Sequence, residues 1–96
     1  MKVLVSDRAD ADLLQIYQYL VGRNPAAAES AIREIDRKFE NLGHFPFIGR
    51  DRSSLASGIR SIVSGPYVIF YTVMSDRVVV VRVLDGRRDI DAEFQR

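Results

Sequence analysis

Several residue types are missing or scarce in this chain of 96 residues. Cysteine and tryptophan are absent, and His44 is the single histidine. The lack of cysteine excludes disulfide bonds and thiolate metal ligands. No apolar run approaches the roughly 20 residues that cross a bilayer, and the first apolar stretch, which ends before Asp7, is too short for a secretory signal. We therefore expect a cytoplasmic protein with no membrane association, metal or cofactor.

The net charge is also small, since 14 basic and 13 acidic residues give the chain a charge of only +1. This balance does not indicate binding to nucleic acid by the molecule as a whole, and we expect no direct DNA binding. The cations are nevertheless unevenly distributed, because every basic residue after position 49 is an arginine. Arginine presents a planar fork that suits carboxylates and phosphates. The second half of the chain is therefore the better candidate for a contact surface.

The length and composition are those of one small globular domain, covering residues 1–96. Hydrophobic residues make up 47% and charged residues 28% of the chain, which is ordinary for a soluble domain. A chain of this size buries only roughly 60–65% of its unfolded surface. We expect modest stability, to which a bound partner would add.

The first half of the chain predicts a strand followed by two helices. Residues 2–5 form a short apolar strand, and Ser6 or Asp7 can cap a helix with acidic residues near its positive end. Asn24 and Pro25 are suited to begin a second helix, which we place from about Pro25 to Leu42 with Gly43 as its C-cap. The short break between these amphipathic helices predicts an antiparallel hairpin.

The second half predicts three antiparallel strands after an irregular connection over residues 44–58. The strands are placed at 59–64, 67–74 and 78–84, separated by short turns. Residues 68–71 and 78–81 are apolar on both faces, whereas a strand with one wet face alternates. The expected fold is α+β: an N-terminal strand, a helical hairpin and a three-stranded meander, with the helices on one face of the sheet.

The other face of that sheet is the central question for function. Alternation leaves it apolar and edged by arginine, and an open surface of this kind usually marks a binding site. The alternative is that the C-terminal tail, residues 87–96, folds back and covers it. The sequence leaves both possibilities open.

Six segments, in this order, resemble the ParE/RelE superfamily of bacterial toxins, and specifically its ParE branch. They are Ala9–Leu13 with Ile16–Leu20, Asn24–Ala28, Phe45–Arg50, Gly58–Ser61, Tyr67–Tyr71 and Val81–Asp89. The resemblance covers nearly the whole chain. Asp85 is one departure, since such toxins often have histidine at this position.

The resemblance implies the toxin of a type II toxin–antitoxin system, acting in plasmid stabilisation or growth regulation. A ParD-like antitoxin would neutralise it in a hetero-oligomer, and the free toxin would bind and inhibit DNA gyrase. RelE-type relatives instead cleave mRNA on the ribosome, which is the alternative. A copy that has lost toxicity and only binds its antitoxin is a third possibility.

Catalysis of the RelE kind needs groups that move protons and stabilise a crowded phosphate. By position, the arginine of the middle strand falls at Val68 and the C-terminal tyrosine falls near Phe94. Arg60 and Arg88 are the only matching cations, and arginine is a poor base because it remains protonated. We therefore expect no catalytic residues and no enzyme.

The candidate residues for antitoxin or target binding lie in the second half of the chain. Val68 and Phe70 are the apolar candidates. For Arg82, in the last strand, either a partner's acidic group or an internal carboxylate such as Asp89 would compensate the charge. The remaining candidates are Arg60, Arg87 and Arg88.

Overall fold

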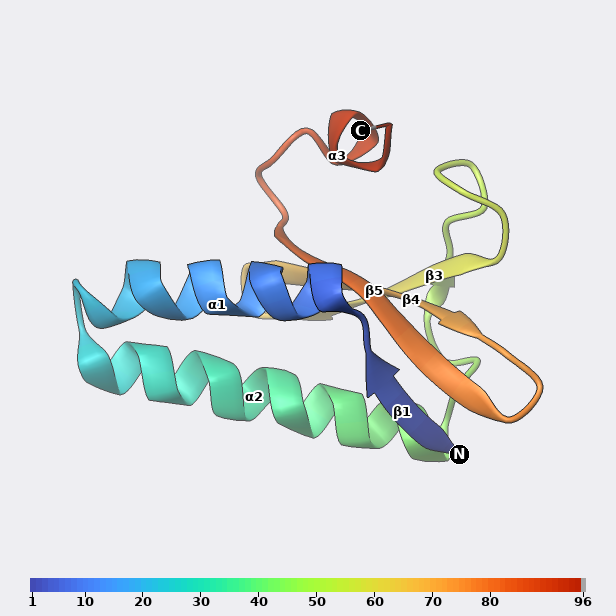
Figure 1. The fold of residues 1–96 in the computed structure, drawn as a ribbon, viewed down its shortest axis with the longest axis horizontal. Coiled ribbons are helices and arrows are strands. Elements are labelled where there is room, and N and C mark those ends of the chain that lie inside the picture. Colours follow the sequence, from blue (N-terminus) through green and yellow to red (C-terminus); the bar gives the residue numbers. More distant parts are fainter. Residues whose placement is uncertain (96) are drawn as a thin grey trace.

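A computed structural model describes residues 1–95, in which helices and a sheet form an α+β fold (Figure 1). Within these residues, no helix is both long and apolar enough to cross a membrane. Along the chain the elements are β1 (Lys2–Val5), α1 (Asp7–Val21), α2 (Pro25–His44), β2 (Arg50–Asp51), β3 (Ile59–Ser64), β4 (Tyr67–Val73), β5 (Arg77–Asp85) and α3 (Ile90–Phe94).

The two long helices form the predicted antiparallel hairpin, and their N-termini are capped as the sequence indicates. The Ser6 hydroxyl accepts a hydrogen bond from the Ala9 amide at 3.1 Å. The Asn24 side chain accepts one from the Ala27 amide at 3.2 Å, with Pro25 at the first helical position. Because each cap satisfies an amide that the helix itself cannot, the starts of both helices are fixed locally.

The end of α2 differs from the prediction. Gly43 is not a C-cap: the helix continues to His44, and Phe45 is the cap residue. Glycine is instead required by the N-terminus, since a Cβ at position 43 would lie 2.8 Å from the Met1 carbonyl oxygen. The Met1 ammonium donates a hydrogen bond to the Gly43 carbonyl at 2.8 Å. Gly43 thus allows the start of β1 to rest on α2.

The sheet has five strands in the order β1-β5-β4-β3-β2. The predicted antiparallel meander forms its centre, with β4 paired to both β3 and β5. β1 pairs in parallel with β5, so that Lys2 lies opposite Arg77. The short β2 lies within the connection that was expected to be irregular and pairs with β3. The first and last strands of the chain are therefore neighbours.

The two faces of the sheet have separate cores. On one face, α1 and α2 pack on the sheet, as Figure 1 shows. On the other, Ile59, Phe70 and Leu84 are buried beneath partly buried residues that include Ile90 and Phe94 of α3. The tail therefore folds back over the second face, as one of the two alternatives expected. The last residue of the expected cover, Arg96, lies outside the described residues.

Candidate functional site

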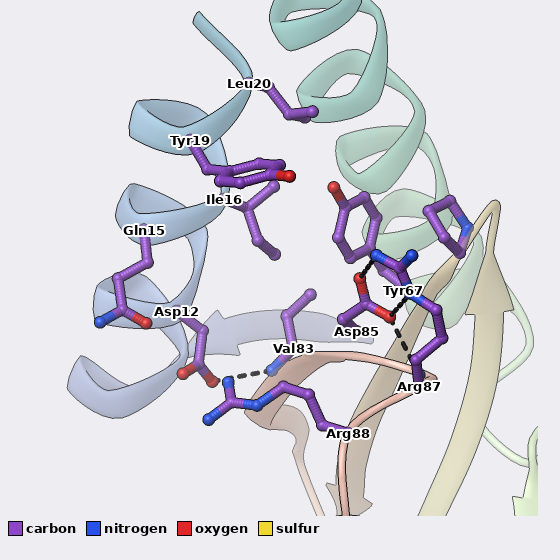
Figure 2. A pocket seen from close by; sticks show the side chains of 11 residues that line it. Asp12, Gln15, Ile16, Tyr19, Leu20, Tyr67, Val83, Asp85, Arg87 and Arg88 are labelled. Carbon is purple, nitrogen blue, oxygen red and sulfur yellow. Dashed lines mark hydrogen bonds and ion pairs between the residues drawn. The ribbon is translucent and has the colours of Figure 1, made fainter. Parts of the chain in front are cut away.

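A groove runs between α1 and the end of the sheet where the β3–β4 turn meets the end of β5. It has a volume of about 720 Å³ and is open to solvent. Figure 2 shows its lining: Asp12, Gln15, Ile16, Tyr19, Leu20, Pro66, Tyr67, Val83, Asp85, Arg87 and Arg88.

The walls of the groove are apolar. Ile16, Tyr19 and Leu20 project from one face of α1 toward Tyr67 and Val83 (Figure 2). Tyr19 is 57% exposed, and the Arg23 guanidinium lies 4.5 Å from the centre of its ring. Burial raises the pKa of Tyr67, so its phenol is neutral at physiological pH. The site offers a partner apolar contact area with phenol groups that can form hydrogen bonds.

The rim of the groove is made by two consecutive arginines after β5. The Arg87 guanidinium donates two hydrogen bonds to the Asp85 carboxylate, from Nε to Oδ1 at 3.1 Å and from a terminal nitrogen to Oδ2 at 2.8 Å. The backbone amide of Arg87 also donates to Oδ1. These bonds hold the pKa of Asp85 at about 2. The Arg87 side chain nevertheless remains 85% exposed. Arg88 bonds to Glu93 of α3. Both arginines are thus positioned by carboxylates of the chain itself.

Beneath the rim, a buried ion-pair network joins three elements. Arg82 on β5 donates to both carboxylate oxygens of Asp12 on α1, at 2.8 and 3.0 Å, and the Val83 amide donates to the same carboxylate at 2.9 Å. Arg82 also contacts the Glu93 side chain on α3 at 3.4 Å. The hydrogen bonds that Arg82 donates to Asp12 raise the pKa of Arg82. This guanidinium therefore connects the helical layer to the C-terminal cover.

The network depends on an irregularity in the sheet. Phe70 pairs with Arg82, but the next residue, Tyr71, pairs with Val80, so one residue of β5 is left without a partner. Such a bulge bends a strand and redirects the side chains next to it. Here the unpaired residue is Val81, which directly precedes Arg82, the residue whose guanidinium contacts Asp12 and Glu93.

This arrangement corrects two expectations. The carboxylate compensating Arg82 is not Asp89, which caps α3 instead, but Asp12 together with Glu93. Asp12 does more than place charge near the helix start, because it is only 6% exposed. Its position was visible in the sequence: Asp12 follows Ala9 by three residues and precedes Ile16 by four, so it shares their helix face.

Phe70 and Val68 do not lie in the groove. Phe70 is fully buried on the other face, with the Phe94 ring edge-on at 4.8 Å and the Arg52 guanidinium at 5.4 Å from its centre. Val68 packs beside this cluster and is partly buried. The expectation that Phe70 lies on an open surface is therefore wrong, because alternation shows which face a residue is on but not what covers it.

Arg60 also lies away from the groove. It donates to the carbonyl oxygens of Phe47 and Gly49, at 3.3 and 2.8 Å, and so fixes the connection between α2 and β2. Of the six predicted binding residues, only Arg87 and Arg88 line the groove. The part of the groove that sequence reasoning missed is its α1 wall, because Ile16, Tyr19 and Leu20 were not among the candidates.

The residue at the position of the RelE-type tyrosine lies outside the groove. Phe94, at the position of the RelE-type tyrosine, has no titratable group and packs on Phe70. Among residues 1–95, no cluster of three or more histidine, aspartate or glutamate side chains could hold a metal ion.

Comparisons with known proteins decide the family. The family model described as "ParE toxin of type II toxin-antitoxin system, parDE" matches residues 3–90. The chain belongs to the ParE toxin family. The sequence resemblance to the ParE branch is thereby confirmed, and this chain is the ParE-type toxin of a type II toxin–antitoxin system.

Several relatives of this ParE-family toxin match along most of their length. "Toxin ParE3" of Caulobacter vibrioides is 31% identical over 97% of this chain and 94% of its own. "Toxin ParE1" of Mycobacterium tuberculosis is 32% identical, covering 94% of each chain. "Toxin RelE3" of C. vibrioides is 33% identical over 84% of this chain and 89% of its own.

The fold is shared with a solved structure. A chain of the "Chromosomal ParDE TA system from P. aeruginosa" superposes with a TM-score of 0.75 at 24% identity, covering 86% of this chain and 92% of that one. The predicted α+β fold, with its strand, helical hairpin and meander, is thereby confirmed as ParE/RelE-like.

Proposed function

We propose that a ParD-like antitoxin neutralises this toxin by placing an apolar, acid-bearing segment in the groove beside α1. We further propose that the free toxin binds and inhibits DNA gyrase without catalysing a reaction. The observation that carries the first proposal is the groove itself, in which an apolar wall ends at two arginines.

The chemistry of the groove specifies the segment it would accept. When a partner covers this open apolar surface and removes it from water, the free energy of the system falls, which favours the complex. Arg87, which is largely exposed, can bind a partner carboxylate through the donors that Asp85 does not engage. A segment with leucine- or isoleucine-like side chains toward Tyr19 and acidic side chains toward Arg87 therefore fits.

The proposal of a binder, not an enzyme, rests on the residues at the RelE-type positions. Val68 is aliphatic, and Phe94 has no proton to exchange. Arg60 is committed to two backbone carbonyls, and Arg88 is paired with Glu93. Neither arginine can act as a general base, because guanidinium stays protonated.

Similarity to "Toxin RelE3" supports one alternative, a ribosome-dependent mRNA ribonuclease. The two functions predict different outcomes when the toxin is induced without antitoxin. Inhibition of purified gyrase supercoiling supports the proposal, whereas codon-positioned cuts in mRNA support the ribonuclease. No growth arrest at all would indicate a copy that retains only antitoxin binding.

The groove is tested by two variants on the same helix. Tyr19 lines the groove and Leu14 does not, yet both are 57% exposed. Tyr19→Ser is expected to weaken binding of the antitoxin encoded with the toxin by about 10–100-fold, because aromatic anchors dominate such interfaces. Leu14→Ser should leave affinity unchanged. Isothermal titration calorimetry measures both.

Equal affinity losses in the two variants would contradict the groove as the antitoxin site. The fold must be intact for the comparison, which circular dichroism establishes. Both side chains are largely exposed, so neither substitution opens a cavity in the core.

A further inference from the structure

A second surface lies outside the groove, on the turn between α2 and β2. Phe45, Phe47 and Ile48 are 63%, 65% and 67% exposed, within four consecutive residues. Apolar side chains exposed singly are normal on a protein surface, but a group of large ones indicates an interaction site. We refer to these three residues as the aromatic turn.

The backbone of the aromatic turn is held in place by the rest of the fold. The Ile48 amide bonds to the Phe45 carbonyl at 3.2 Å and closes the turn. Arg60 on β3 holds the carbonyls of Phe47 and Gly49, and the Gly49 amide donates to the buried Tyr71 hydroxyl at 2.8 Å. The backbone that presents the exposed side chains is therefore fixed in advance, and a partner would lose less backbone conformational entropy on binding them.

The charge around the aromatic turn is mainly positive. The Arg60 guanidinium lies 5.2 Å from the centre of the Phe47 ring, and Arg50 is exposed directly after the turn. The neighbouring Asp51 carboxylate accepts a hydrogen bond from the Ser53 amide. Complementary charge on a partner would thus be acidic, placed around a pocket that receives the rings.

The aromatic turn is separated from the groove along the sheet. Tyr67, at the start of β4, lines the groove, whereas Tyr71 on the same strand anchors Gly49. Four residues of a strand span about 13 Å. A segment that fills the groove can therefore leave the turn uncovered.

We propose that the aromatic turn is the surface through which the toxin docks on the protein it inhibits, and that the partner presents an apolar pocket rimmed by carboxylates. This inference rests on the proposed function, in which the target is a protein. It separates the two activities of the molecule: the groove serves the antitoxin, and the aromatic turn serves the target.

The test uses the double variant Phe47→Ser/Ile48→Ser, with Leu14→Ser as a control of similar exposure elsewhere. In the double variant, inhibition of purified DNA gyrase should weaken about 30-fold or more, because a few large apolar anchors dominate such interfaces. Growth arrest on induction should be lost. Antitoxin affinity should stay within twofold of the wild type. Leu14→Ser should behave as the wild type in all three assays.

A second variant tests whether the partner's pocket is rimmed by carboxylates, and it leaves the apolar side chains of the aromatic turn in place. Arg50→Glu should slow association with gyrase about 10-fold, and the difference from the wild type should shrink as salt is raised, because charges at an interface rim act mainly on association. Loss of inhibition with no dependence on salt would argue against a carboxylate rim.

Three results would overturn the docking surface. Unchanged inhibition and arrest in the double variant would show that the target binds elsewhere. A parallel loss of antitoxin affinity would assign the turn to the antitoxin. Micromolar self-association of the wild type that the double variant abolishes, with arrest intact, would make it a contact between two copies of this chain.

The behaviour of the wild-type toxin shows whether the proposed function or the proposed docking surface has failed. If it arrests growth but does not inhibit gyrase, the gyrase assignment fails, and loss or retention of arrest in the double variant still decides the surface. If it does not arrest growth, the proposed toxicity and the docking surface fail together.

Discussion

The two faces of the sheet are covered in different ways. On one face, helices of 15 and 20 residues bury an apolar core that includes Ile35, Phe39 and Val80. On the other, a helix of five residues lies over Phe70, held by the apolar side chains of Ile90 and Phe94 and by ion pairs to Glu93. Cooperative stability comes from large apolar contacts, and small covers open at lower cost. We therefore expect the hairpin face to hold the fold together and the α3 face to open locally.

The largest contrast should appear when the same side chain is removed from each cover. Phe39 on α2 is 8% exposed, and Phe94 on α3 is only partly buried. Phe39→Ala should lower the free energy of unfolding by about 4 kcal/mol, and Phe94→Ala by about 2 kcal/mol. Urea denaturation measures both. Hydrogen exchange should show that Phe94→Ala mainly frees the amides of α3, and equal global losses would contradict the comparison.

The connection between the two covers is tested at Asp12. Asp12→Ala leaves the Arg82 guanidinium buried without its main partner, which should cost about 3 kcal/mol of stability. Glu93→Gln should cost less, because Asp12 still compensates the charge. Both are measured by the same urea denaturation.

A paired substitution provides the control for Asp12. Replacing both charges with apolar residues, as in Asp12→Leu with Arg82→Met, should recover part of the lost stability, since no unpaired charge remains and only the Val83 amide loses its acceptor. If the double variant is as unstable as Asp12→Ala, packing at this position matters more than charge.

The smallest effect is expected at the exposed pair on the groove rim. In the folded chain the Asp85 pKa is lowered from 3.8 to about 2, first by the Arg87 side-chain hydrogen bond. A lowered pKa stabilises the fold at pH values above about 4, and this contribution is lost as the pH falls toward 2. Arg87→Gln should return the Asp85 midpoint toward 3.8 in an NMR titration. Stability at pH 7 should hardly change, because exposed pairs contribute little.

Local signals allowed most of the fold to be predicted. Both helix starts follow from the caps at Ser6 and Asn24, and the meander follows from short turns between apolar runs. The position of β1 could not be predicted, because its parallel partner, β5, lies far away in the sequence and leaves no local pattern. The end of α2 was misjudged because Gly43 is required for close contact with Met1 and not for a turn.

The site was less predictable than the fold. Arg87 and Arg88 were identified from their place after the last strand, and both line the groove. Phe70 was misplaced because a helix as short as α3 shows no periodicity that would predict a cover. The groove also depends on how α1 lies against the end of β5, which no residue pattern specifies.

The pairing of β1 with β5 has a consequence for how the toxin is made. Lys2 leaves the ribosome early, but its partner Arg77 emerges about 4–15 s later at usual rates of synthesis. Until β5 emerges, β1 has no neighbouring strand to pair with, and the groove lacks Val83 and Asp85. The groove can therefore be completed only after nearly the whole chain has left the ribosome.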